Sequence, residues 1–325
     1  MDGVARVAAI DCGTNSIRLL VADLPDEADV RAPLADVVRR MEIVRLGQGV
    51  DRTSRLAPEA IERTRAALAD YAGQISALGA ERVRMVATSA TRDAANAGEF
   101  RDMVVRILGV PPEVVTGDDE ARLSFTGAVR GLPPQTEPPF LVVDIGGGST
   151  EFVVGASTVE HAISVDIGCV RMTERHLHDD PPTPGQIRAA EADIAAGVDR
   201  ALTVVPGRDA RTLVGLAGSV TTVTALALGL DRYDPAQIHH ARVSYPDVAK
   251  VTADLLAMTK AQRLSLPVMH PGRADVIGAG ALVLRIVMER AGADDVIASE
   301  HDILDGIAWS LASTGGGDRA APGSV

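Results

Sequence analysis

Aromatic residues are scarce in this sequence. One Trp, three Tyr and four Phe make up 2% of its 325 residues. Proteins that bind single-stranded nucleic acid stack successive bases on aromatic side chains, so this scarcity argues against such a role. It also favours a ligand that is recognised through phosphate groups over one that is recognised through a purine ring.

Cysteines and long apolar runs are also nearly absent. Two cysteines, Cys12 and Cys169, provide neither a disulfide framework nor a metal site. No run reaches the roughly 18 apolar residues that a membrane helix needs. The first six residues lack the basic and apolar regions of a signal peptide. We therefore expect a cytoplasmic protein without a membrane partner, long enough for two domains.

Acidic residues outnumber basic ones. The formal net charge is −12, which disfavours general affinity for nucleic acid or anionic membranes. A polyanionic ligand would then need a local basic lining. Six arginines are candidates, although each could be a solvated surface residue and for the last three the surface interpretation is preferred: Arg18, Arg92, Arg122, Arg130, Arg171 and Arg175.

An apolar strand, a glycine-rich turn and a second apolar strand follow one another over residues 141–155. The turn reads Asp144-Ile-Gly-Gly-Gly-Ser-Thr-Glu151. Consecutive glycines let the backbone approach a ligand closely and turn its amides toward phosphate oxygens. Asp144 and Glu151 would repel a phosphate unless a divalent cation lay between them, and carboxylate oxygens suit Mg²⁺. Alone, the stretch could equally be an ordinary hairpin turn.

A second copy of this pattern stands near the N-terminus. It reads Asp11-Cys-Gly-Thr-Asn-Ser16 and continues into an apolar run. The matching positions are Asp11 with Asp144, Gly13 with Gly146, and Ser16 with Ser149. Arg18 stands where the second copy has Glu151, so one turn presents a cation and the other a carboxylate. This is the difference expected between the two halves of a phosphate–metal site.

Strands and helices are predicted along the rest of the chain from apolar periodicity and from helix start and stop signals. The further strands are expected at 37–46, 83–87, 114–115, 159–165, 212–216 and 296–298. Helices are expected at 58–78, 100–108, 117–131, 184–202, 246–258, 260–266, 272–291 and 303–311, and from about 168 and 220. The composition of 132–139 is typical of a linker, and that of 315–325 of a disordered tail.

Polar residues gather at three of these element ends. The strand at 83–87 leads to Arg92, which could grip a phosphate bidentately or pair with Asp93 or Glu99. The helix at 117–131 begins with three acids, which capping and the helix dipole already explain. Gly215-Leu-Ala-Gly-Ser219 joins a strand to a helix and could point amides at an anion. A metal site at the adjacent His239 and His240 is not expected, because no acid stands at ligand spacing.

Six motifs resemble those of the exopolyphosphatase/guanosine pentaphosphate phosphatase (Ppx/GppA) family, in the same order over nearly the whole chain. They are Asp11-Cys-Gly-Thr-Asn-Ser16, Ala87-Thr-Ser-Ala-Thr-Arg92, Gly117-Asp-Asp-Glu-Ala-Arg-Leu123, Asp144-Ile-Gly-Gly-Gly-Ser-Thr-Glu151, Gly215-Leu-Ala-Gly-Ser219 and Arg273-Ala-Asp-Val-Ile277. At Ser299-Glu-His-Asp302 the sequence departs from the Ser-Asp-Gly-like motif that is usual in the family.

The resemblance implies an α/β fold of the superfamily of actin, sugar kinases and heat-shock ATPases. Two actin-like (ribonuclease H-like) lobes, each a mixed sheet flanked by helices, would enclose an active-site cleft. Residues 1–120 with 303–325 would form the N-terminal lobe, and 121–302 the C-terminal lobe. Members of this kind form homodimers.

The resemblance also implies an Mg²⁺-dependent hydrolase that releases orthophosphate from the end of inorganic polyphosphate. Short chains are expected, because this sequence ends before the C-terminal helical domain of longer members. Guanosine pentaphosphate is the alternative substrate. A kinase of the same superfamily and a non-enzymatic phosphate-ligand sensor are further alternatives.

Roles follow from the matching motif positions. Glu120 would activate the attacking water with a pKa raised by Asp118 and Asp119, and Asp119 could share its role. Asp144 and Glu151 would hold Mg²⁺, mostly through waters. The terminal phosphoryl group would be bound by Asp11, Gly13, Thr14, Asn15, Ser16, Arg92, Gly146, Gly147, Gly148, Ser149 and Thr150.

Overall fold

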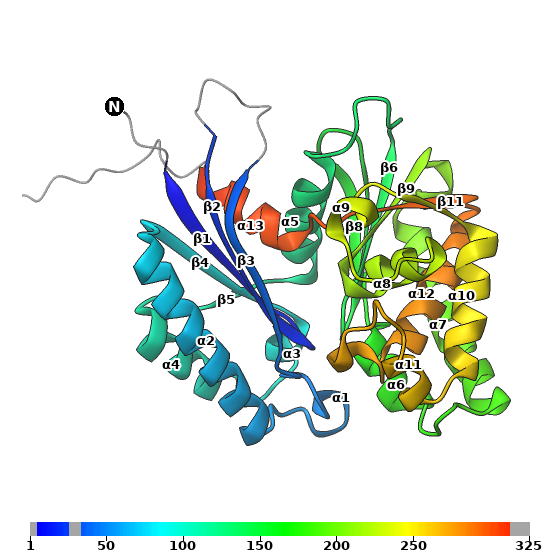
Figure 1. Cartoon of the computed structure of the whole chain (residues 1–325), viewed down its shortest axis with the longest axis horizontal. Helices are drawn as coiled ribbons and strands as arrows, with labels where there is room; N and C mark the ends of the chain where they lie inside the picture. The colour runs from blue at the N-terminus through cyan, green and yellow to red at the C-terminus, as the bar shows by residue number, and fades with distance from the viewer. Residues whose placement is uncertain (1–4, 26–33, 313–325) are drawn as a thin grey trace, which may run out of the picture.

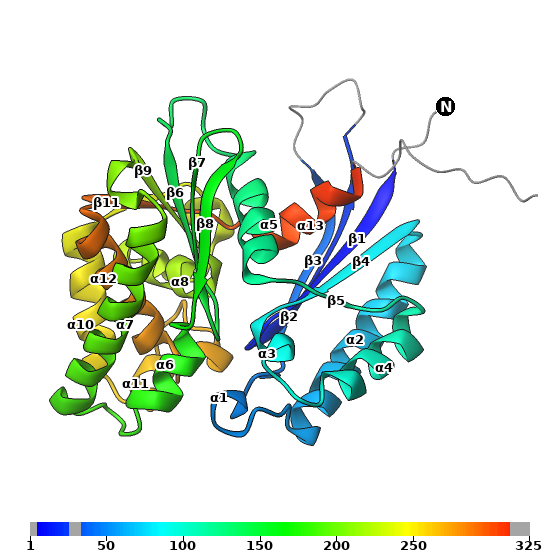
Figure 2. The ribbon, with the colours of Figure 1, turned by 180° about the vertical axis from the view of Figure 1, so that it is seen from behind.

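The computed structural model describes residues 5–25 and 34–312 and contains two lobes, each built on one mixed β-sheet with helices on its faces (Figure 1, Figure 2). This confirms the expected fold class. The predicted disordered tail at 315–325 lies outside the described residues. No helix in the described ranges is long and apolar enough to cross a bilayer.

The N-terminal lobe contains a five-stranded sheet in the order β3-β2-β1-β4-β5. Its strands are β1 (Arg6–Cys12), β2 (Ser16–Asp23), β3 (Ala35–Ile43), β4 (Arg82–Ala87) and β5 (Glu113–Val114). The first three are antiparallel, and β4 and β5 run parallel to β1. The helices are α1 (Val50–Thr53), α2 (Pro58–Leu78), α3 (Ser89–Arg92) and α4 (Ala97–Leu108). Apolar side chains of α2 and α4 cover one face of the sheet.

The C-terminal lobe contains a six-stranded sheet in the order β10-β11-β9-β6-β7-β8. Its strands are β6 (Phe140–Ile145), β7 (Thr150–Gly155), β8 (Val159–Val165), β9 (Thr212–Leu216), β10 (Arg242–Ser244) and β11 (Asp295–Ala298). Its helices are α6 (Cys169–His176), α7 (Pro184–Val204), α8 (Ala217–Ala227), α9 (Pro235–Ile238), α10 (Tyr245–Ala257), α11 (Lys260–Leu264) and α12 (Ile277–Ala291), with 3₁₀ turns η1 (Gly207–Asp209) and η2 (Pro271–Arg273).

The two sheets share one topology. Read from β8, the order β8-β7-β6-β9-β11 repeats β3-β2-β1-β4-β5, with the same parallel and antiparallel pairings. The duplicated turns of the sequence therefore join equivalent strands, β1 to β2 and β6 to β7. Every residue of β6 is buried, as expected for a central strand that is covered on both faces.

Two helices lie between the sheets, α5 (Gly117–Val129) and α13 (Ile303–Ala312), as both views show. Helix α5 packs Ala121 and Phe125 on the C-terminal sheet, whereas α13 packs Ile303 and Ile307 on the N-terminal sheet. The helices cross in contact, because a Cβ atom on Gly127 would overlap the carbonyl of Asp302. A Cβ atom on Gly306 would likewise overlap the carbonyl of Leu123.

Short elements account for most differences from the predicted secondary structure. Helices α1, α3 and α9 have four residues each and β10 has three, too few to show a periodic pattern. The helix expected at 272–291 begins only at Ile277, after the 3₁₀ turn η2. Helix α8 begins at Ala217 rather than near 220, directly after β9.

Candidate active site

A cavity of about 100 Å³ lies between the lobes where the two duplicated turns face each other. Its predicted lining residues are Asp11, Gly13, Thr14, Asn15, Ser16, Glu120, Asp144, Gly146, Gly147 and Ser149. Further lining residues include Arg18, Thr88, Ser89, Cys169, Ala217, Gly218, Ser219 and Arg273. Four predicted site residues are not part of the lining: Arg92, Gly148, Thr150 and Glu151.

The glycine-rich turn is held from behind by the start of α6. The amides of Gly168, Cys169 and Val170 donate to the carbonyls of Gly148, Gly146 and Gly147 at 3.2, 2.9 and 2.8 Å. In a trans peptide the carbonyl and the next amide point in opposite directions. The amides that follow these carbonyls therefore point away from α6, on the side of the turn that can offer N–H donors to an anion.

Glycines in this turn also allow the lobes to approach closely. A Cβ atom on Gly148 would lie 2.6 Å from Ser89 Oγ and 2.8 Å from Thr14 Oγ1, and one on Gly147 would lie 2.8 Å from Thr14 Cβ. The hydroxyls of Thr14 and Ser89 are 2.9 Å apart. Gly148 is thus an interlobe contact rather than part of the lining. The Thr150 hydroxyl donates to Ile167 O at 3.1 Å, which fixes it within its own lobe.

Equivalent cross-strand pairs differ in charge between the lobes. Asp11 is paired with Arg18 across β1 and β2, and Asp144 with Glu151 across β6 and β7. Arg18 donates from Nε and Nη2 to Asp11 Oδ2 at 3.0 and 2.7 Å. In the C-terminal lobe two carboxylates stand opposite each other instead, which is destabilising unless a cation or protons offset their charge.

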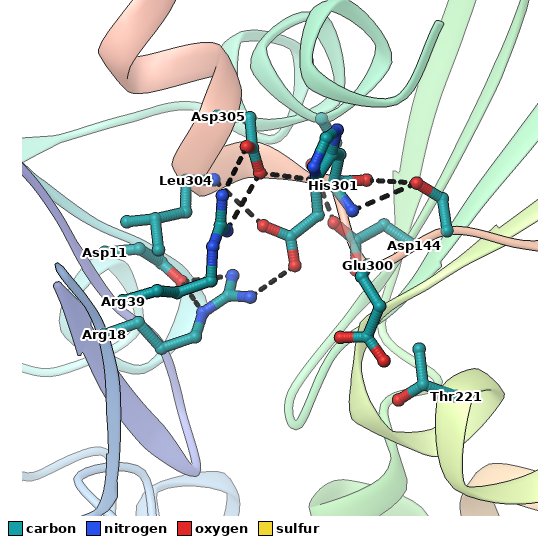
Figure 3. A network of polar contacts seen from close by, with 12 residues as sticks. Asp11, Arg18, Arg39, Asp144, Thr221, Glu300, His301, Leu304 and Asp305 are labelled. Carbon is teal, nitrogen blue, oxygen red and sulfur yellow. Dashed lines mark hydrogen bonds and ion pairs between the residues drawn. The ribbon is translucent and has the colours of Figure 1, made fainter. Parts of the chain in front are cut away.

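Arg18 is bound between two acids from distant parts of the chain. Its other partner is Asp302, just before α13, and in Figure 3 its guanidinium points toward that helix alongside Arg39. Arg39 Nη2 donates to Asp305 Oδ1 at 2.6 Å. Arg18 therefore borders the cavity but is already neutralised by carboxylates, which limits its attraction for a polyanion.

Among the three acids that begin α5, Glu120 alone faces the cavity. Thr116 caps the helix by accepting from the Asp119 amide at 3.1 Å, and its hydroxyl donates to Asp119 Oδ2 at 2.7 Å. Asp118 and Asp119 are exposed, whereas Glu120 is buried. The geometry therefore gives Asp119 a capping role and leaves Glu120 beside the cleft.

Burial raises the pKa of Glu120 well above its usual range, and the nearby charge of Glu151 raises it further. Asp144 and Asp11 act in the same direction, and Arg92 opposes them. The expectation that Asp118 and Asp119 cause this shift is wrong, because both acids point to solvent.

Arg92 contacts Glu120 rather than the cavity. Its Nη1 donates to Glu120 Oε2 at 3.3 Å and to Val115 O at 3.1 Å. The alternative pairing with Asp93 or Glu99 is not observed. Arg92 thus orients the carboxylate that faces the cleft.

Burial and mutual repulsion favour the protonated form of the carboxyl groups near the cavity. Burial, followed by the charge of Glu151, raises the pKa of Asp144 to about 8, and burial raises the pKa of Glu151. Ser124 Oγ donates to Asp144 Oδ2 at 2.6 Å, and Ser164 Oγ to Glu151 Oε1 at 2.7 Å. Sequence patterns gave no signal for either serine, since each lies far along the chain from its acid.

These carboxylates suit a divalent cation that keeps several waters. Asp11 Oδ1 is buried and has no hydrogen-bond partner, and both Asp11 and Asp144 line the cavity. Within residues 5–25 and 34–312, no three His, Cys, Asp or Glu side chains are arranged to hold a metal ion. Mg²⁺ is usually bound by one or two carboxylates of the protein, and waters and substrate phosphates complete its coordination. Asp11 and Asp144 therefore fit this ion.

A second cavity of about 510 Å³ adjoins the first. The two share Arg18, Ala217, Gly218 and Arg273 in their linings. Arg273 forms no ion pair with a carboxylate in the described part of the chain, and a Cβ atom on Gly218 would overlap its guanidinium. The rest of the lining includes Met41, Tyr233, Pro235, Val268, Met269 and Glu300.

Other candidates from the sequence lie away from the cavities. Arg122 and Arg130 are exposed, and Arg130 stacks over Trp309 at 4.3 Å. The rings of His239 and His240 stack with centroids 3.6 Å apart. Arg175 is exposed, as expected, whereas Arg171 is largely buried, and both form ion pairs with Asp51 of the other lobe.

The family model of the Ppx/GppA phosphatase family matches residues 25–314. The chain belongs to this family, which confirms the resemblance seen in the six motifs.

Individual relatives are similar over most of the chain. Exopolyphosphatase 2 of Mycobacterium tuberculosis is 54% identical over 318 residues, which cover 95% of this chain and 99% of that protein. The guanosine-5'-triphosphate,3'-diphosphate pyrophosphatase of Aeromonas hydrophila is 28% identical over 305 residues, which cover 94% of this chain and 59% of that protein. The crystal structure of an Aquifex aeolicus Ppx/GppA family member has a TM-score of 0.80 at 32% identity and covers 96% of this chain and 99% of its own.

Proposed function

We propose that this protein is an exopolyphosphatase that hydrolyses the terminal phosphoanhydride bond of inorganic polyphosphate. The observation that carries the proposal is the buried Glu120 carboxylate, which faces a cavity formed by two phosphate-type turns from opposite lobes. The 54% identity to a protein named Exopolyphosphatase 2 supports the same substrate class.

The geometry suits in-line attack by water. Amides and hydroxyls of the two turns would bind the oxygens of the terminal phosphoryl group. Glu120, held by Arg92, would orient a water molecule and accept its proton as the water oxygen attacks phosphorus. The bond between phosphorus and the bridging oxygen breaks, and orthophosphate and a chain shortened by one phosphate are released. Burial raises the pKa of Glu120, which makes its ionised carboxylate a stronger base toward the water proton.

Asp144 would hold Mg²⁺, mostly through waters, with Asp11 on the opposite side of the cavity. Glu151 lies outside the cavity lining and would contribute negative charge. When bound, the cation neutralises phosphate oxygens. Arg273 borders both cavities and would bind the next phosphate of the chain.

Guanosine pentaphosphate 5'-phosphohydrolase activity is the second candidate, and one observation favours it. The second cavity places Tyr233 and apolar side chains beside Glu300, whose carboxylate accepts from the Tyr233 hydroxyl at 2.6 Å. An acid disfavours a polyphosphate chain there, but a carboxylate can accept from the N–H groups of a guanine ring. The name of the Aeromonas hydrophila relative agrees with such a substrate.

Phosphate release with Mg²⁺ from short polyphosphate, long polyphosphate, guanosine pentaphosphate and ATP tests these alternatives. We expect the highest rate with polyphosphate and a loss of about 10²–10⁴-fold in Glu120→Gln, because this variant cannot accept the proton. Binding of tripolyphosphate, measured by calorimetry, should persist. Asp119→Asn is the matched control, since Asp119 lies in the same helical turn outside the cavity.

Unchanged phosphate release in Glu120→Gln would refute the mechanism, and absence of release from every substrate by the wild-type protein would favour the sensor. Phosphate transfer from ATP to an acceptor such as acetate or a sugar would favour the kinase. The homodimer implied by the family stays a prediction, which light scattering tests, and so does the cytoplasmic location.

A further inference from the structure

Arg171 on α6 contacts both lobes with one guanidinium group. Its Nε donates to Gly148 O at 2.6 Å in the glycine-rich turn of its own lobe. Its Nη2 donates to Asp93 Oδ2 at 2.7 Å, and Nη1 forms an ion pair with Asp51, both in the N-terminal lobe. The side chain is only 11% exposed, although it carries a charge. Three acceptors on two lobes thus share one rigid, planar donor.

The contact to Gly148 acts on the turn that would bind the phosphoryl group. Gly148 O also accepts from the Gly168 amide, but at the longer distance of 3.2 Å. The bond from Arg171 is shorter and charge-assisted, hence the stronger of the two. It fixes the peptide after Gly148, whose N–H belongs to the cavity-lining Ser149. Arg171 therefore sets the direction of an amide beside the reacting phosphate without lining the cavity itself.

The contacts on the N-terminal lobe act on elements that line or support the same cavity. Asp93 directly follows α3, which carries Ser89 at the cavity and Arg92 against Glu120. Asp51 belongs to α1, which follows a loop packed on Thr14. The space enclosed between these elements and α6 is only about 10 Å³. The contacts of Arg171 with Asp51 and Asp93 therefore form only when the two lobes are as close together as in this structure.

Arg175 provides a contrast one helical turn along α6. It donates to both oxygens of Asp51, at 2.7 and 2.8 Å, so it crosses between the lobes as Arg171 does. Its side chain is 34% exposed and forms ion pairs with Asp51 and Asp193 rather than a contact with the glycine-rich turn. An ion pair that is exposed to solvent in this way contributes little to stability. The pair at Arg175 can hold the lobes together but cannot orient the amides.

We propose that Arg171 is a positioning residue that couples closure of the lobes to the alignment of the glycine-rich turn. When the lobes close, Asp51 and Asp93 fix its guanidinium, and Nε then holds Gly148 O so that the amide of Ser149 faces the phosphoryl group. When they separate, the guanidinium loses Asp51 and Asp93 and keeps only Asp166 of its own lobe, 3.7 Å away, so Nε no longer holds Gly148 O in a fixed direction. The inference rests on the proposed hydrolysis for its catalytic consequence, but not for the coupling itself.

The test compares Arg171→Gln with the matched control Arg175→Gln. With Mg²⁺ and tripolyphosphate, we expect kcat of Arg171→Gln to fall about 10–100-fold, since small displacements of catalytic groups cost this much, whereas KM changes less than about threefold. Native-state hydrogen exchange of the amides at 168–171, which donate to the turn, should accelerate at least about tenfold. Arg175→Gln should stay within about twofold of wild type in both measurements.

Asp93→Asn tests the coupling from the other lobe, far from the turn in sequence. It should accelerate exchange at 168–171 as Arg171→Gln does, and the double variant should be no worse than the more affected single variant. Asp93→Asn also tests the coupling if Arg171→Gln fails to fold.

The inference is overturned if hydrogen exchange at 168–171 is unchanged in Arg171→Gln or in Asp93→Asn. It is also overturned if Arg175→Gln changes kcat and exchange as much as Arg171→Gln does. Absence of tripolyphosphate hydrolysis in the wild-type protein would defeat the proposed function, while the exchange comparison would still decide the coupling.

Discussion

At the residue scale, the acids and arginines around the cavity have partners from distant parts of the chain. Spacing placed Asp11 and Asp144 at equivalent turns, and both line the cavity. Nothing in the sequence linked Asp144 to Ser124, or Arg18 to Asp302, because strand and helix packing bring them together over long separations. The contact of Arg92 with Glu120 was not predictable for the same reason, and its expected role in binding phosphate stays a prediction.

The opposed carboxylates of Asp144 and Glu151 predict a stability that depends on pH and metal. The folded-state pKa of Asp144, about 8, lies above its ordinary value of 3.8. Its contribution to stability is therefore present below about pH 4 and is lost as the pH rises to about 8. Asp144→Asn removes this loss and should stabilise the metal-free protein at pH 8 by on the order of 1–3 kcal/mol.

Thermal unfolding in EDTA at pH 6 and pH 8 measures this effect. Added Mg²⁺ should raise the melting temperature of wild type at pH 8 but not that of Asp144→Asn. Equal responses of the two proteins to Mg²⁺ would remove Asp144 from the proposed metal site.

At the element scale, long elements with regular apolar spacing were predictable, whereas close helix crossings were not. The helix at 58–78 was predicted with the bounds that α2 shows. The crossing of α5 and α13 depends on Gly127 and Gly306. In the sequence these are two separate small residues, and no pattern relates one to the other. Only the packed structure shows that their backbones touch.

The crossing predicts a large cost for one added methyl group. Gly127→Ala should lower the free energy of unfolding by at least about 1–3 kcal/mol, because the Cβ atom forces the two helices apart. Gly73→Ala in α2 is the control, since its Cβ atom would meet no neighbour within 4 Å. This control should gain up to about 1 kcal/mol from helix propensity. Urea unfolding measures both, and equal effects would contradict the backbone contact.

The histidines around β11 predict sensitivity to acid. Burial, with the neighbouring His240 and His301, lowers the pKa of His239 to about 3. His239 Nδ1 accepts from the Glu300 amide at 3.2 Å, which requires an unprotonated nitrogen. The stability from His239 is present above its ordinary pKa of 6.5 and is lost as the pH falls toward 3. Unfolding midpoints between pH 7 and pH 4 should therefore fall less steeply in His239→Asn than in wild type.

At the scale of the whole molecule, the last helix completes the first lobe. Apolar residues of α13 cover Val7 and Leu20 on the N-terminal sheet, and Asp305 on this helix binds Arg39 of β3. Sequence motifs indicated two lobes and their duplicated turns. They carried no information on the ion pairs that attach the helix, because these join residues more than 260 positions apart.

The attachment predicts unequal effects for the two acids that share Arg39. Asp305→Asn should destabilise the protein by about 2–3 kcal/mol, because it leaves a half-buried arginine without its buried partner, and Asp305 is 2% exposed. Asp36→Asn should cost less than about 1 kcal/mol, since Asp36 is 40% exposed. Similar losses in chemical denaturation would show that burial does not decide the strength of these pairs.

The position of α13 also determines the order in which the chain can fold as it is synthesised. The ribosome makes strands β1 to β5 first, yet one face of their sheet stays open to water until residues 303–312 emerge. The C-terminal sheet has all of its own helices, including α5, before that point. The half of the protein that is translated first is thus completed last, and until then its apolar face is available to chaperones or to aggregation.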